Sequence, residues 1–115
     1  MIRKNLVVKG LERVAMNNPY GFTYDISTFT PVTSGFTVAY KETQDSFERV
    51  GLEKVIDFSQ QLDHQLVGGW LNEKNGLYYY DSIKLFKNKD DAIAFGLDNQ
   101  QIAIFNLDTL TEIKL

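Results

Sequence analysis

Residues 36–70 read FTVAYKETQDSFERVGLEKVIDFSQQLDHQLVGGW, and residues 77–105 read LYYYDSIKLFKNKDDAIAFGLDNQQIAIF. In each stretch an apolar strand pattern is followed by a short helical pattern and then by a second apolar strand pattern. Asn75-Gly76 lies between the two stretches and favours a hairpin turn, because both residues tolerate positive φ. The sequence therefore predicts the order strand–helix–strand–strand–helix–strand, which is the split β-α-β or ferredoxin-like order.

The predicted fold is a single α+β domain over residues 1–115. Its antiparallel sheet carries two helices, mainly on one face, and the β-α-β-β-α-β unit spans residues 35–106. Residues 1–20 form an N-terminal extension whose apolar positions fit a helix and a strand equally well. The architecture is therefore predicted for most of the chain, while the form of the extension stays open.

Three local signals refine this prediction. Asp45 and Glu48 have the spacing of a capping box at the start of the first helix, and Asn88 is typical of an N-cap before the second. The segments 24–32 and 105–113 resemble each other: both read as an extended segment, a polar turn and a short return strand. We interpret this similarity as a shared type of turn, whose Ser, Thr and Asp oxygens satisfy the turn's own amides.

Composition excludes several classes of protein. The 115 residues contain no cysteine, so disulfides, thiolate nucleophiles and cysteine-based metal sites are excluded. The apolar runs are far shorter than a membrane span, and residues 1–15 lack the uninterrupted apolar region of a signal peptide. The expected location is therefore the cytoplasm.

The sequence contains no recognisable catalytic, cofactor-binding or metal-ligating constellation, so we predict no catalytic residue, no cofactor and no metal. His64, the lone histidine, is interpreted as a loop residue. The acidic residues are dispersed, and no pair of them has the pattern of a hydrolase. Enzymatic activity therefore stays an alternative that no motif favours.

The favoured function is a non-enzymatic module that binds a protein partner. Aromatic side chains dominate the energetics of interfaces, and polar loops at strand ends often carry recognition. The candidate partner-binding residues are the aromatic residues Trp70, Tyr78 and Tyr80 and the loop residues Glu42, Gln44, Asp45 and Ser46. A homodimer formed through exposed sheet edges is a further alternative.

The second function considered is binding of single-stranded nucleic acid. If one sheet face is open, Phe36, Val38 or Tyr40 with Tyr78 and Tyr80 would resemble the base-stacking platform of an RNA-recognition motif. Basic residues gather at the N-terminus, within residues 3–13. The net charge of −3 disfavours this function, because nucleic-acid binding needs a basic surface.

Several stretches together resemble short bacteriophage, prophage and mobile-element proteins of unknown function. The stretches are Thr30-Pro31-Val32-Thr33-Ser34-Gly35-Phe36-Thr37-Val38-Ala39, Lys41-Glu42-Thr43-Gln44-Asp45-Ser46-Phe47, Val67-Gly68-Gly69-Trp70 with Tyr78-Tyr79-Tyr80-Asp81-Ser82, and Asn99-Gln100-Gln101-Ile102-Ala103-Ile104-Phe105. The resemblance implies a small cytoplasmic accessory protein that acts on a host component.

Overall fold

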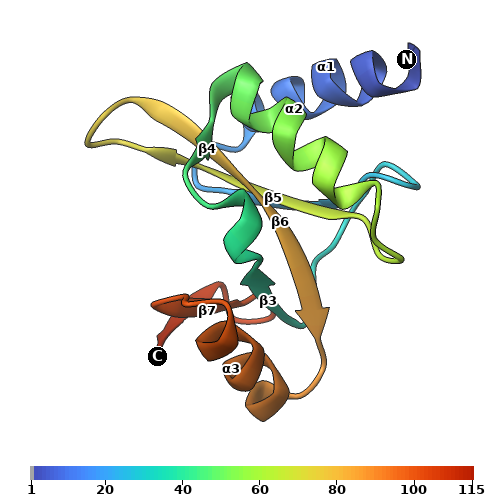
Figure 1. Ribbon diagram of the computed structural model, residues 1–115. Coiled ribbons are helices and arrows are strands. Elements are labelled where there is room, and N and C mark those ends of the chain that lie inside the picture. Colours follow the sequence, from blue (N-terminus) through green and yellow to red (C-terminus); the bar gives the residue numbers. More distant parts are fainter. Residues whose placement is uncertain (1) are drawn as a thin grey trace.

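Three helices and an eight-stranded antiparallel sheet make up residues 2–115, the part of the chain that the computed structural model describes (Figure 1). The helices are α1 (Ile2–Asn17), α2 (Glu48–Ser59) and α3 (Lys89–Asp98), and η1 (Lys41–Thr43) is a 3-10 turn. The strands are β1 (Phe22–Asp25), β2 (Thr30–Pro31), β3 (Phe36–Ala39), β4 (Ser46–Phe47), β5 (Leu66–Asn72), β6 (Leu77–Phe86), β7 (Ala103–Asn106) and β8 (Thr111–Lys114). Within residues 2–115, none of the helices has both the length and the apolar character needed to cross a bilayer.

The strands follow the order β2-β1-β5-β6-β3-β7-β8 across the sheet, and β4 pairs with β6. The ten-residue β6 is the central strand, and it runs the length of the molecule in Figure 1. It pairs with β5 on one side and, on the other, first with β4 and then with β3. The loop between β3 and β4 is therefore held against the middle of β6.

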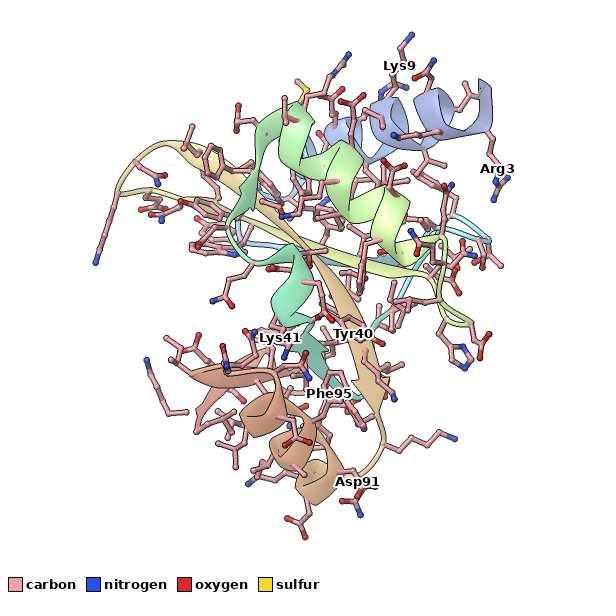
Figure 2. The ribbon with its side chains drawn as sticks, viewed as in Figure 1. Arg3, Lys9, Tyr40, Lys41, Asp91 and Phe95 are labelled. Carbon is pink, nitrogen blue, oxygen red and sulfur yellow. The ribbon has the colours of Figure 1, made fainter. Side chains whose placement is uncertain are left out.

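The helices cover one face of the sheet. Alternate residues of a strand point to opposite faces. Val38 is buried with Ala92 of α3, so its neighbours Thr37 and Ala39 point to the other face. The ring of Tyr40 contacts Phe58 of α2 and Phe95 of α3, at centroid distances of 5.4 and 5.3 Å, and Figure 2 shows Tyr40 beside Phe95. Both helices therefore lie on the same face and leave the opposite face open.

The N-terminal extension forms the helix α1, so the helical alternative is correct for this segment. Its buried residues Val7, Val8, Leu11 and Ala15 belong to the same core cluster as the buried residues of α2. Ion pairs connect the two helices, from Lys4 to Asp57 and from Arg49 to Glu12. Figure 1 shows α1 and α2 together at one end of the molecule and α3 at the other.

The two similar segments form equivalent hairpins at opposite edges of the sheet. In β1–β2 the Asp25 side chain accepts a hydrogen bond from the backbone N–H of Ser27, at 2.9 Å. In β7–β8 the Asn106 side chain accepts the corresponding bond from the backbone of Asp108, at 2.9 Å. Phe29 and Leu110 occupy matching positive-φ positions, at 53° and 55°. The prediction of a shared turn is therefore confirmed.

One predicted cap is correct and the other is wrong. The Asn88 side chain accepts a hydrogen bond from the backbone N–H of Asp91 at 3.1 Å, which caps α3. The capping box of Asp45 and Glu48 does not form, because α2 begins at Glu48 itself. The Glu48 carboxylate instead accepts a hydrogen bond from the backbone N–H of Tyr78, at 2.8 Å. The Glu48 side chain thus bonds to strand β6 and does not cap α2.

Candidate functional site

The open face of the sheet contains a hollow of about 1180 Å³. Residues of β1, β3, β5, β6 and β7 line it, together with the loop before β4. The lining includes Tyr20, Thr23, Thr37, Ala39, Gln44, Asp45, Gly68, Trp70, Tyr79, Asp81, Ile83, Ile102, Phe105, Leu110 and Glu112. We call this surface the hollow.

Trp70 and Tyr79 form an aromatic wall of the hollow. They are directly opposite each other on β5 and β6, and their rings stack with centroids 5.2 Å apart and planes at 22°. The Tyr79 hydroxyl accepts a hydrogen bond from the side chain of Asn75 at 2.9 Å, which fixes the ring. Trp70 is 44% exposed, so this wall presents a large aromatic surface to solvent.

Gly68 forms a floor without a side chain. It pairs with Asp81 of β6 and with Thr23 of β1, so its missing side chain would point into the hollow. A Cβ at this position would have no neighbour closer than the backbone oxygen of Phe22 at 3.5 Å, an ordinary contact. The Cγ2 and Cδ1 atoms of Ile83 lie 3.6 and 3.7 Å from the same point, so a methyl group fits there and a larger side chain would crowd the hollow beside Asp81.

Asp81 places a partly buried carboxylate in the hollow. Burial raises the pKa of its side chain from 3.8 to about 6, and repulsion from the Asp45 carboxylate adds to this. Among the described residues, no side chain or backbone group donates a hydrogen bond to the Asp81 carboxylate. The charged residues that line the hollow are Asp45, Asp81 and Glu112, and this lining contains no lysine, arginine or histidine. The charged side chains in the lining are therefore all acidic, and Glu112 is already paired with Lys114 at 3.3 Å.

Buried hydrogen bonds position the loop that carries Asp45. The Thr43 hydroxyl accepts a bond from the backbone N–H of Ser82 at 3.0 Å, and the Ser46 hydroxyl donates to the Thr43 carbonyl at 2.7 Å. Thr43 and Ser46 are buried, whereas Gln44 and Asp45 between them are exposed at the rim. The two buried hydroxyls therefore hold two polar side chains beside the hollow.

The predicted partner-binding residues separate into two groups. Trp70, Gln44 and Asp45 line the hollow, and Glu42 is exposed on η1. The other candidates are poorly placed for contact with a partner, because Tyr80 and Ser46 are 4% and 3% exposed and Tyr78 is half-buried. Tyr78 and Tyr80 point to the helix-covered face because they alternate along β6 with Tyr79 and Asp81.

The predicted base-stacking platform does not form. Phe36 and Val38 pack in the core cluster of α3, and Tyr40 packs between α2 and α3. Tyr78 and Tyr80 belong to the core cluster beneath α1 and α2. Burial raises the pKa of Tyr80 to about 12 and raises that of Tyr78 further. All five residues therefore lie on the covered face, where they cannot stack on bases.

Asp81, Tyr79 and Gly68 are site residues that sequence reasoning missed. The signal was present in residues 77–86, where alternation places an aspartate on the same face as Tyr79 and Ile83. An aspartate within a strand that is otherwise apolar on that face is costly unless it has a role or a partner. Of the three consecutive tyrosines, Tyr78 and Tyr80 lie on the helix-covered face and Tyr79 on the open face.

Within residues 2–115, no three His, Asp or Glu side chains gather closely enough to hold a metal ion. Comparison with protein-family models, with curated proteins and with solved structures found no match to this chain.

Proposed function

We propose that this protein is a binding module and that the hollow on the open sheet face receives a protein partner. The observation that carries this proposal is the rim of the hollow. Tyr20, Trp70, Ile102 and Leu110 line it and are 95%, 44%, 80% and 74% exposed. Large apolar side chains gathered around a concave surface are typical of interaction sites, and aromatic residues often supply most of the binding energy.

The breadth of the hollow favours a segment of a protein as its occupant, because the lining runs across the sheet from β1 to β7. The sheet edges are less suited to pairing. Edge strand β2 is two residues long and contains Pro31, and edge strand β8 carries Glu112 and Lys114. Short, charged and proline-containing edges resist pairing with a second chain, so the face is the better interaction surface.

Nucleic acid is the weaker alternative. A phosphate backbone would meet only acidic charged groups in the hollow. The basic residues gathered near the N-terminus lie instead on α1, where Figure 2 shows Arg3 and Lys9. Two of these cations are already engaged, because Arg3 donates to the carbonyl of Ser27 at 3.2 Å and Lys4 pairs with Asp57. The salt dependence of binding separates this alternative from the first.

We also propose that residues 35–106 form a ferredoxin-like unit to which α1 and the two edge hairpins are added. The adjacency of β5, β6, β3 and β7 in that order supports this proposal, as does the position of α2 and α3 on one face. On the resemblance to bacteriophage and mobile-element proteins, the partner would be a protein of the host.

A catalytic role is the second candidate, and Asp81 is the observation that favours it. A carboxyl whose pKa lies near 6 is suited to donate and accept a proton near neutral pH. Asp45 at the rim supplies a second carboxylate. If the site is catalytic, Asp81→Asn will abolish turnover of a substrate that the variant still binds.

The test of the proposed function is a pull-down from a lysate of the source organism with paired variants. Trp70→Ser removes an exposed apolar side chain at the hollow, and Val50→Ser removes one that is 80% exposed on α2. We expect a stoichiometric protein to be retained at high salt by the natural chain and by Val50→Ser, and to be lost with Trp70→Ser. Equal retention by both variants would contradict the proposal. Recovery of nucleic acid that is lost at high salt would support the alternative.

A further inference from the structure

The charge of the hollow constrains its occupant. Asp45, Asp81 and Glu112 are its charged lining residues, within the described part of the chain. An anionic segment, or one without hydrogen-bond donors, would leave the Asp81 carboxylate desolvated without a partner, which is costly in a partly buried position. A cationic group would supply the missing hydrogen-bond donors and remove the repulsion between Asp81 and Asp45.

The surroundings of Asp81 are shaped for a flat cation. Trp70 faces Tyr79, and Asp81 is two residues from Tyr79 on the same face of β6. Trp70 and Asp81 are therefore diagonal neighbours, which in sheets lie about 7–8 Å apart. Gly68 pairs with Asp81 and contributes no side chain of its own, and the nearest side chain to its Cβ position is that of Ile83 at 3.6 Å. An aromatic wall, a glycine in the floor and a carboxylate thus adjoin one another.

Among the basic side chains, arginine fits this arrangement better than lysine. Its guanidinium is planar, stacks on aromatic rings and donates two parallel hydrogen bonds to a carboxylate. Its positive charge is attracted to the face of an indole ring. A lysine ammonium holds its water more strongly and cannot make the paired bonds.

We propose that the hollow admits an arginine side chain from a protein partner, with the guanidinium stacked on Trp70 and paired with the Asp81 carboxylate. This inference rests on the proposed function, because it specifies the occupant of the same surface. The exposed apolar residues Ile102 and Leu110, at the β7–β8 side of the hollow, would contact the flanking residues of the partner segment.

The experiment uses a displayed library of random linear peptides, selected on the natural chain. Each recovered peptide is tested on Gly68→Leu, whose larger side chain fills the floor of the hollow, and on Trp70→Ala in case the first variant fails to fold. Circular dichroism checks that each variant is folded. We expect the selected peptides to share an arginine and to lose binding to these variants.

The charge is then tested within one peptide. Replacing its arginine by citrulline keeps the shape and removes the charge. We expect this change to weaken binding to the natural chain by about tenfold or more. The same change should have little effect on binding to Asp81→Asn, because the carboxylate that the cation pairs with is gone.

The outcomes separate the inference from the proposed function. Peptides that depend on the hollow but carry no arginine, or carry lysine in its place, would overturn the inference and leave the proposed function standing. If replacing arginine by citrulline weakens binding to the natural chain and to Asp81→Asn equally, the inference is likewise overturned and the proposed function stands. If every recovered peptide binds Gly68→Leu and Trp70→Ala with the same affinity as it binds the natural chain, both the inference and the proposed function are overturned.

Discussion

Ser59 of α2 donates a hydrogen bond to Ser82 of β6, with 2.7 Å between the two hydroxyl oxygens. Neither residue has measurable solvent exposure. The bond therefore ties the helix to the central strand within the core. The backbone N–H of Ser82 also donates to Thr43 at 3.0 Å, so one position of β6 holds both α2 and the loop beside the hollow.

Removing one of these two hydroxyls should lower the free energy of unfolding by more than half of the loss that follows from removing both. Ser59→Ala leaves the Ser82 hydroxyl buried without its partner, which should lower the free energy of unfolding by about 1–3 kcal/mol. The double variant Ser59→Ala/Ser82→Ala removes both polar groups, so its loss should be smaller than the sum of the two single losses. Urea unfolding of the four proteins measures this difference. Strictly additive losses would show that the bond contributes nothing specific.

Gly51→Ala should destabilise the protein, whereas Gly68→Ala should be nearly neutral. A Cβ at Gly51 would fall on the backbone carbonyl carbon of Ser46, which cannot move without breaking the β4–β6 pairing. The expected loss is about 1–3 kcal/mol, even though alanine is the better helix former by about 1 kcal/mol. Gly68→Ala makes the same change where the nearest atom is 3.5 Å away. Thermal unfolding of both variants compares them, and a stabilised Gly51→Ala would contradict the close approach.

Asn88→Ala should weaken the start of α3. The Asn88 side chain accepts the hydrogen bond from Asp91, and its loss at an N-cap costs about 1 kcal/mol. Asn88→Asp is the matched control, because aspartate keeps the acceptor and its charge favours the helix N-terminus. The free energy of unfolding should therefore fall for alanine and stay near the natural value for aspartate. If both substitutions lower the free energy of unfolding equally, the hydrogen bond at the N-cap does not stabilise α3.

Periodicity and turn chemistry were sufficient to predict the α+β class, the main strands and the cap at Asn88. They could not decide between helix and strand for residues 1–20, because the choice depends on packing of Val7 and Leu11 against α2. The Glu48 side chain likewise bonds to the backbone of Tyr78, thirty positions along the chain, and no local pattern reports such a contact. Local signals thus predicted local structure, and long-range contacts decided the rest.

The candidate site was predicted only in part for a related reason. Trp70, Gln44 and Asp45 were among the candidate partner-binding residues, and they line the hollow. Alternation along residues 77–86 divides the tyrosines between two faces, but it does not tell which face the helices cover. The hydrophobic cluster around Leu11 and Leu52 covers the face of Tyr80 and leaves that of Asp81 open. The sequence did not decide whether residues 1–20 form a helix. It therefore could not show which face of the sheet α1 covers.

The charge on Asp81 should make the protein less stable as the pH rises. Its pKa is about 6 in the folded protein and 3.8 ordinarily, so between these values the folded state binds more protons than the unfolded state. The destabilisation is therefore absent below about pH 4 and fully developed above about pH 6. Burial is the larger cause and the Asp45 carboxylate the smaller, so the unfavourable free energy belongs to the ionised form.

Asp81→Asn should remove this destabilisation. The variant should be more stable than the natural chain at pH 7, by about 1–3 kcal/mol, and should match it closely at pH 4. Urea unfolding of both proteins across this range measures the gap, which should widen as the pH rises. Asp63→Asn, the same substitution in the exposed turn before β5, serves as the control. A gap that stays constant with pH for Asp81→Asn would show that the Asp81 carboxylate is well solvated, and the hollow would then lack the unpaired charge that favours a cationic occupant.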